Sequence, residues 1–158
     1  MTAYPDTSFL CALYRRQENS EQALTYRASM SGPLLATPLV LWEFRQSVRF
    51  QAFRHSKNPH VGFSIHEATR MIDKIADHTQ AGLIQVAECD LLHVLAEGER
   101  ISKSRTPSGG HRGFDILHIA TALKLGAKNF LTFDANQARL ALAEGLKVPL
   151  VLLRPQES

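Results

Sequence analysis

Short apolar segments alternate with amphipathic helical patterns along the 158 residues, and this alternation is the strongest constraint on the fold. The predicted strands cover residues 2–4, 34–36, 82–87, 129–133 and 149–153. Short apolar strands separated by helices are typical of parallel sheets that are buried on both faces. We therefore predict an α/β fold, a three-layer α/β/α sandwich around a short central parallel sheet.

The helices are predicted from apolar residues at helical spacing and from their capping signals. Thr37 followed by Pro38 is a favourable helix start, and Ser64 with Glu67 three residues later forms a capping box. Residues 104–113 are rich in Gly, Ser, Pro and basic residues, which predicts a loop. The predicted helices cover residues 7–16, 20–30, 38–55, 64–79, 91–102, 114–125 and 135–144.

Length and composition restrict the class of protein. A chain of 158 residues with 44% hydrophobic residues is expected to form one domain with its own core. Cys11 and Cys89 have neither zinc-site nor CxxC spacing, which fits a reducing compartment. No run of about 20 apolar residues occurs, so we expect a cytoplasmic protein. The net charge of +3 does not by itself indicate nucleic-acid binding.

Three aspartates occupy similar positions relative to the predicted strands and helices. Asp6 and Asp134 each follow a strand and precede a helix, and Asp115 lies in the first turn of a helix. In a parallel α/β sheet these positions share one edge, where ligands bind. Glu43 lies inside a helix between Trp42 and Phe44, where a carboxylate is costly unless a cation meets it.

A cluster of carboxylates has a characteristic chemistry. Crowded carboxylates repel each other, which raises their pKa values or recruits a cation. Their hard oxygen atoms favour Mg²⁺ or Mn²⁺, and such an ion can activate water for displacement at phosphorus. A single aspartate early in a helix is usually only a cap. The four acids together instead favour a metal site.

Motifs spread over nearly the whole chain resemble those of one family. They are the DTS sequence at residues 6–8, Thr37-Pro38 leading to Glu43, FDILHIATAL at residues 114–123 and FLTFD at residues 130–134. In order and approximate spacing they resemble the PIN-domain nucleases, and among these the VapC-type toxins of type II toxin–antitoxin pairs.

This resemblance implies a single PIN domain over residues 1–158 and a metal-dependent endoribonuclease that uses Mg²⁺ or Mn²⁺. It also implies a homodimer, an RNA substrate and a cognate VapB-type antitoxin. The implied catalytic and metal-binding residues are Asp6, Glu43, Asp115 and Asp134. Thr7 or Ser8 would supply a hydroxyl near the acids and the RNA, Thr132 would support Asp134, and His118 would pack or form hydrogen bonds.

Basic residues near the predicted site are candidates for binding the RNA backbone. Lys103, Arg105, His111 and Arg112 lie in or next to residues 104–113, beside Asp115. We expect Arg112 to contact phosphate. One departure from the family is Pro5, which occupies the place of an apolar strand residue and could shorten the first strand.

Two other functions remain open from the sequence. The first is a metal-dependent phosphatase, or another phosphoryl-transfer enzyme, with Asp6 as its nucleophile. Such an enzyme would have a second aspartate two positions on, where this chain has Ser8. The second is a noncatalytic RNA-binding PIN module with a degraded site, which the four acids disfavour.

Overall fold

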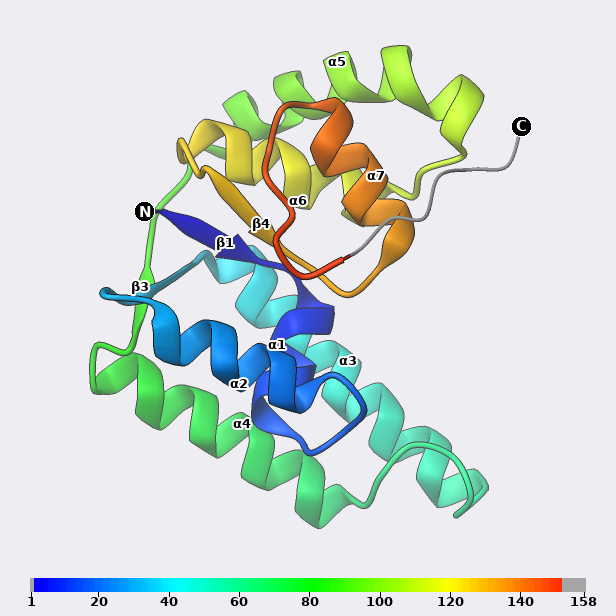
Figure 1. Cartoon of the computed structure of the whole chain (residues 1–158). Coiled ribbons are helices and arrows are strands. Elements are labelled where there is room, and N and C mark those ends of the chain that lie inside the picture. The colour runs from blue at the N-terminus through cyan, green and yellow to red at the C-terminus, as the bar shows by residue number, and fades with distance from the viewer. Residues whose placement is uncertain (1, 152–158) are drawn as a thin grey trace.

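The computed structural model describes residues 2–151, in which helices and three-residue strands alternate (Figure 1). The strands are β1 (Ala3–Pro5), β2 (Leu34–Ala36), β3 (Ile84–Val86) and β4 (Asn129–Leu131). The helices are α1 (Thr7–Tyr14), α2 (Ser20–Ser29), α3 (Pro38–Lys57), α4 (Ile65–Gln80), α5 (Leu91–Gly109), α6 (Gly113–Lys124) and α7 (Ala135–Ala143).

The strands form a short parallel arrangement. β1 pairs with β4 in parallel, with Tyr4 opposite Phe130, and β2 pairs with β3 in parallel, with Leu35 opposite Gln85. β1 and β2 pack side by side, so the spatial order is β3-β2-β1-β4. The predicted α/β class with a short parallel sheet is confirmed.

Helices cover the strands from two sides, as predicted. In Figure 1, α5, α6 and α7 lie above the strands, and α1, α2 and α4 lie below them. Helix α1 packs against α2, α3 and α4, and α6 packs against α5 and α7. The core between these layers includes the fully buried side chains Tyr4, Phe9, Phe44, Ile119 and Phe130.

The capping signals and Pro5 have clear structural outcomes. Thr37 and Ser64 accept hydrogen bonds from the backbone N–H groups of Val40 and Glu67, as N-caps do. A cap of this kind contributes about 1 kcal/mol. Pro5 is the last residue of β1, and the next N–H, that of Asp6, donates to the carbonyl of Leu131 at 2.9 Å. The proline therefore does not disturb the strand pairing that places Asp6.

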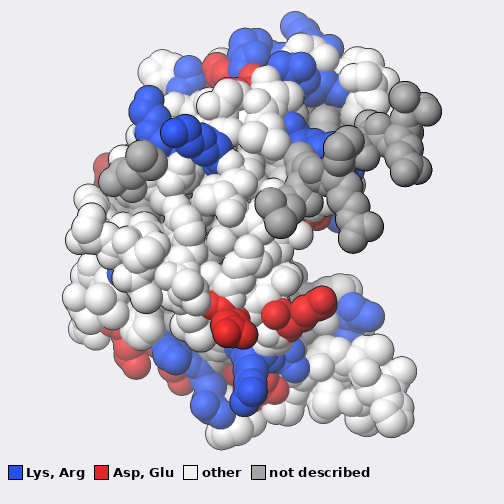
Figure 2. Space-filling view, viewed as in Figure 1, with Lys and Arg blue, Asp and Glu red and all other residues white. Residues whose placement is uncertain are grey.

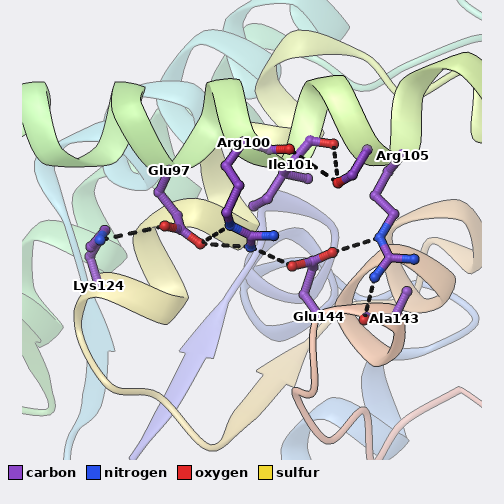
Figure 3. Close-up of polar contacts among 8 residues, drawn as sticks. Glu97, Arg100, Ile101, Arg105, Lys124, Ala143 and Glu144 are labelled. Atoms are coloured by element: carbon purple, nitrogen blue, oxygen red, sulfur yellow. Dashed lines mark hydrogen bonds and ion pairs between the residues drawn. The ribbon is translucent and has the colours of Figure 1, made fainter.

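The predicted loop over residues 104–113 is wrong over most of its length, because α5 continues to Gly109. Arg105 donates to Glu144 Oε1 at 2.7 Å and to the carbonyl of Ala143 at 2.9 Å, which ties this part of α5 to the end of α7 (Figure 3). Local composition favours a loop, but these tertiary contacts oppose it and the helix runs through Pro107. The helix ends at Gly109, and the residue that caps it, Gly110, has a left-handed φ of 62° that suits glycine.

Arg105 belongs to a larger group that we name the ion-pair cluster, formed by Glu97, Arg100, Arg105, Lys124 and Glu144. Arg100 contacts Glu97 at 2.7 Å and Glu144 at 2.5 Å, and Lys124 lies 3.5 Å from Glu97. The cluster therefore joins α5 to both α6 and α7 (Figure 3).

The predicted strand over residues 149–153 is not found where it can be checked. Residues 149–150 form a turn and Val151 is not in a strand, while residues 152 and 153 lie outside the described residues. The chain meets the sheet earlier, where Lys147 forms a parallel bridge with Asn129. The carbonyl of Lys147 accepts a hydrogen bond from the N–H of Phe130 at 2.8 Å. The backbone of this segment is therefore already paired with β4 before residue 149, where the predicted strand would begin.

The surface mixes charges rather than presenting one sign. In Figure 2, Lys and Arg side chains gather near the top and the lower edge of this face, and uncharged side chains lie between them. The same view shows an indentation on its right side, above the lower end of the molecule. Within residues 2–151, no helix is both long and apolar enough to span a membrane.

Candidate active site

Asp6 lies at the end of β1 and caps α1. Its Oδ1 accepts from the N–H of Phe9 at 2.9 Å and from the hydroxyl of Ser8 at 2.7 Å, and its Oδ2 accepts from the hydroxyl of Thr132 at 2.6 Å. The side chain is only 1% exposed. Burial raises the pKa of the Asp6 carboxyl, and the three hydrogen bonds oppose that rise because they favour the ionised form.

Thr132 connects Asp6 to Asp134. Its Oγ1 donates to Asp6 and accepts from the N–H of Asp134 at 2.9 Å, so the contact with Asp134 that the resemblance implied is present. Asp134 caps α7, since its Oδ1 accepts from the N–H groups of Asn136 at 2.7 Å and Gln137 at 3.1 Å. Because these contacts are local to the ends of β1 and β4, strand pairing brings both acids to one edge.

Glu43 extends from α3 to a buried histidine. Its Oε2 accepts from the hydroxyl of Thr7 and from His118 Nε2, the latter at 2.6 Å. His118 is 1% exposed, and its Nδ1 lies 3.2 Å from the hydroxyl of Tyr4, which lies 3.2 Å from Thr37 Oγ1. The prediction that His118 forms hydrogen bonds is confirmed.

The environment of Glu43 settles how a carboxylate is tolerated among apolar neighbours. Burial acts to raise its pKa, but the hydrogen bond and charge of His118, together with the hydroxyl of Thr7, outweigh burial and lower it. The partner that meets Glu43 in this apolar setting is the imidazole of His118. Glu43 is held in the ionised form that binds cations.

Asp115 lies in the first turn of α6 and is half-buried. Burial raises the pKa of its carboxyl, and the negative charge of Asp134 raises it further. The backbone and the positive charge of Arg112 act in the opposite direction, as does His118. Two acids that affect each other in this way lie close enough to repel.

These acids, Asp6, Glu43, Asp115 and Asp134, form what we name the acidic site. Asp6 and Asp134 are joined by Thr132, Asp115 faces the charge of Asp134, and Thr7 joins α1 to Glu43. In the described part of the chain, no group of three or more His, Cys, Asp or Glu side chains is close enough to hold a metal ion. Thr132 thus bonds the Asp6 carboxylate and the backbone N–H of Asp134, and Asp115 lies near the charge of Asp134, whereas no hydrogen bond within residues 2–151 ties Glu43 to another of these acids.

The donor set fits a hard divalent cation by its chemistry. All four side chains offer carboxylate oxygens, the ligands that Mg²⁺ and Mn²⁺ prefer. Among these oxygens, Glu43 Oε1 and Asp134 Oδ2 accept no hydrogen bond from residues 2–151, because the bonds to these side chains go to Glu43 Oε2 and Asp134 Oδ1. They therefore keep their lone pairs for a cation or for water.

The basic residues predicted near Asp115 divide into two groups. Lys103 contacts Glu99 at 3.3 Å, and Arg105 belongs to the ion-pair cluster. Both side chains are therefore engaged in ion pairs with glutamates outside the acidic site. Arg112 precedes α6, is exposed and acts electrostatically on Asp115. It is the predicted phosphate contact whose position still supports that role.

The sequence analysis did not single out Tyr4, although its hydroxyl links Thr37 to His118. Tyr4 is fully buried, and burial raises the pKa of its hydroxyl, so the group stays protonated. A buried tyrosine hydroxyl requires a hydrogen-bond partner, and this rule is the only sequence clue that Tyr4 joins a buried polar contact.

A family model of the PIN domain matches residues 3–142, which is most of the chain. The chain belongs to the PIN domain family, a family of nucleases. The match includes all four residues of the acidic site. No sequence among the curated proteins matches the chain.

Solved structures with the PIN fold resemble the chain over nearly its whole length. One is VapC20 from Mycobacterium tuberculosis, described as a toxin that cleaves the sarcin–ricin loop, with 17% identity, a TM-score of 0.60, and coverage of 98% of this chain and 100% of that one. PAE2754 from Pyrobaculum aerophilum has 17% identity and a TM-score of 0.59, with coverage of 92% and 87%. FitAcB from Neisseria gonorrhoeae has 16% identity and a TM-score of 0.59, with coverage of 93% and 96%. At these identities the likeness establishes the fold.

Proposed function

We propose that this chain is a metal-dependent endoribonuclease and the toxin of a type II toxin–antitoxin pair, with residues 1–158 forming one PIN domain. The observation that carries the proposal is the acidic site at the edge of the parallel strands of a PIN fold. The likeness to VapC20, described as a toxin that cleaves the sarcin–ricin loop, supports RNA as the proposed substrate.

We propose that Asp6, Glu43, Asp115 and Asp134 hold Mg²⁺ or Mn²⁺. When bound, the ion would supply an activated water and would stabilise negative charge on the phosphate. Asp6 contributes a carboxylate fixed by Ser8 and Thr132, and Glu43 contributes one kept ionised by His118. Such preorganisation avoids the cost of reorienting charged groups during the reaction.

Residues beside the acids have separate tasks in this proposal. Arg112, exposed before α6, attracts the phosphate of the RNA toward Asp115. The hydroxyl groups of Thr7 and Ser8 donate to Glu43 and Asp6. We therefore propose that these two residues orient the acids beside the RNA.

The alternative of a phosphatase is less well supported. A nucleophilic aspartate must reach the phosphorus atom, but Asp6 is 1% exposed and both its oxygens accept hydrogen bonds. An extended phosphodiester could instead reach the exposed Arg112 and the half-buried Asp115 and Asp134. A VapB-type antitoxin, a homodimer and a cytoplasmic location complete the proposal.

The proposal is tested by incubating the purified chain with total RNA and with a synthetic sarcin–ricin hairpin. We expect cleavage with Mg²⁺ or Mn²⁺ and none with a chelator. Asp6→Asn and Asp115→Asn should each lower the rate by about a hundredfold or more, since each removes a carboxylate proposed to hold the ion that stabilises the transition state. Glu97→Gln, which alters a carboxylate of the ion-pair cluster, is the matched control and should keep the rate. Cleavage that survives the chelator or both aspartate substitutions would overturn the proposal.

A further inference from the structure

Two large aromatic side chains stack on each other at the surface. Trp42 on α3 is 48% exposed and Phe114 on α6 is 42% exposed. Their ring centroids lie 5.9 Å apart with an angle of 24° between the planes. Leaving so much aromatic surface in water forgoes the free energy that burial would provide. We name these two residues the aromatic pair.

The aromatic pair borders the acidic site. Trp42 immediately precedes Glu43, and Phe114 immediately precedes Asp115. The ring of Phe114 also lies 6.5 Å from that of His118, which bonds Glu43 at 2.6 Å. The pair is thus next to two of the four acids in the sequence, and Phe114 lies beside the histidine that bonds Glu43.

A second exposed aromatic pair offers a contrast. Phe50 and Phe53 stack at 6.3 Å and 25°, but they are three residues apart on α3, so helix geometry alone makes them neighbours. Trp42 and Phe114 come from helices that are distant in sequence and meet only in the folded chain. Their contact is therefore a product of the tertiary structure that also assembles the acids.

Charge near the aromatic pair complements a nucleic acid. Arg112 lies two residues before Phe114 and is exposed, so a phosphate bound there would be close to the rings. Aromatic rings beside a basic residue are the combination that binds single-stranded nucleic acid, because every base has a face that can stack. A base inside a duplex is already stacked and paired, and only an unpaired or splayed base can occupy such a platform.

We propose that Trp42 and Phe114 form a stacking platform for an unpaired nucleobase of RNA, next to the phosphodiester at the acidic site. This inference rests on the proposed ribonuclease function for its substrate. It adds that the nucleotide at the cleavage site is held in a single-stranded form through its base. It also assigns a role to two residues that the acidic site itself does not use.

Trp42 provides a direct probe, because it is the only tryptophan in the chain. The experiment titrates full-length protein carrying Asp115→Asn, in Mg²⁺, with a single-stranded oligoadenylate and follows tryptophan fluorescence. The matched ligand is an abasic ribose-phosphate oligomer with the same number of phosphates. We expect saturable quenching with the oligoadenylate and none with the abasic oligomer. Equal quenching by both ligands would overturn the platform.

Substitutions supply a second readout that does not need cleavage. Phe114→Ala and Trp42→Ala should each weaken binding of labelled oligoadenylate by about 5- to 150-fold, the range for loss of one base–aromatic stack. Phe114→Tyr and Trp42→Phe should restore most of the affinity, since they keep a ring. Phe53→Ala is the control from the second aromatic pair and should bind as the parent does. Thermal unfolding of each variant establishes that it is folded.

The outcomes separate this inference from the proposed function. Base-dependent quenching in a protein that cleaves no RNA would support the platform and overturn the ribonuclease proposal. Cleavage by the wild-type chain, with RNA affinity unchanged in Trp42→Ala and Phe114→Ala, would overturn the platform alone. That second result would point to a protein segment, such as part of an antitoxin, as the occupant of the rings.

Discussion

The ion-pair cluster and the acidic site use the same carboxylate chemistry with opposite electrostatic results. In the cluster, Glu97 and Glu144 face Arg100, Arg105 and Lys124, and hydrogen bonds from the arginines lower the pKa of both glutamates. At the acidic site burial raises the pKa values of Asp6 and Asp115; Asp6 accepts from the hydroxyl groups of Ser8 and Thr132, and Asp115 lies near the charges of Asp134 and Arg112.

This contrast indicates that the ion-pair cluster, rather than the acidic site, stabilises the fold. Carboxylates paired with fixed guanidinium groups stabilise the fold when they are ionised. Carboxylates whose ionisation is disfavoured reduce stability at neutral pH, a cost that persists where a function requires it. Glu43 stands between the two cases, because His118 supplies a partner inside the acidic site.

The largest stability effect should come from His118, the buried connection inside the acidic site. His118→Ala removes the partner of Glu43 and of Tyr4 and leaves a cavity where a fully buried ring was packed. We expect a loss of about 2–3 kcal/mol in the free energy of unfolding, measured by urea denaturation. Tyr4→Phe removes one hydroxyl from the same chain of contacts and should cost about 1 kcal/mol. Equal losses in both variants would contradict a central role for the imidazole.

Glu144→Gln should give the next largest change in the free energy of unfolding, a decrease, because Glu144 pairs with arginines of the ion-pair cluster. Its side chain is 5% exposed and contacts Arg100 and Arg105. Glu144→Gln should lower the free energy of unfolding by about 1–2 kcal/mol at pH 7. Glu99→Gln, in the exposed pair with Lys103, is the control and should change it by about 0.5 kcal/mol or less.

The effect of Glu144→Gln should depend on pH in a defined direction. Because the pKa of Glu144 is lowered in the folded chain, its contribution is complete above the unfolded pKa of about 4.3 and is lost as pH falls through the lower folded pKa. Urea denaturation at pH 7 and at successively lower pH values should therefore show the two proteins converging in acid. If the difference in the free energy of unfolding between the wild-type protein and Glu144→Gln grew in acid, this expectation would be contradicted.

Asp115→Asn should give the smallest effect, with the opposite sign. Because the pKa of Asp115 is raised in the folded chain, ionisation costs stability as pH rises from the unfolded pKa of about 3.9 through the folded pKa. Removing the charge should raise the free energy of unfolding at pH 7 by about 0.5 kcal/mol or less, since solvent screens this half-buried group. The gain should vanish below the unfolded pKa. If Asp115→Asn instead lowered the free energy of unfolding at pH 7 in the metal-free protein, it would act with the same sign as Glu144→Gln, and the comparison of the two regions would be contradicted.

Much of the fold could be predicted because its signals are local. The strand over residues 34–36, the helix that begins after Thr37 and the N-cap at Ser64 depend on neighbouring residues, and the structure contains all three, although the Glu67 carboxylate bonds Arg15 rather than completing a capping box. Residues 104–109 could not be predicted in this way. Their helix depends on the contact of Arg105 with Glu144, which is 39 residues away, while the local Gly, Ser and Pro content favours a loop.

Some parts of the acidic site could be predicted from the sequence, and others could not. Strand-end logic is sufficient to bring Asp6 and Asp134 to one edge, and the structure links them through Thr132. The position of Glu43 relative to the other acids followed only from the family resemblance, because a helix pattern does not state which helix packs where. The pairing of His118 with Glu43 spans 75 residues and has no local signal.

The most direct test of the account is calorimetric titration of Mn²⁺ into the purified chain. The account predicts saturable binding to the wild-type protein that Glu43→Gln and Asp134→Asn each weaken at least tenfold, because both remove a carboxylate proposed as a ligand. Glu97→Gln should bind Mn²⁺ as the wild-type chain does, since Glu97 faces arginine and lysine in the ion-pair cluster. Absence of Mn²⁺ binding to the wild-type chain, or equal binding by Glu43→Gln and Asp134→Asn, would contradict the claim that these carboxylates form a metal site.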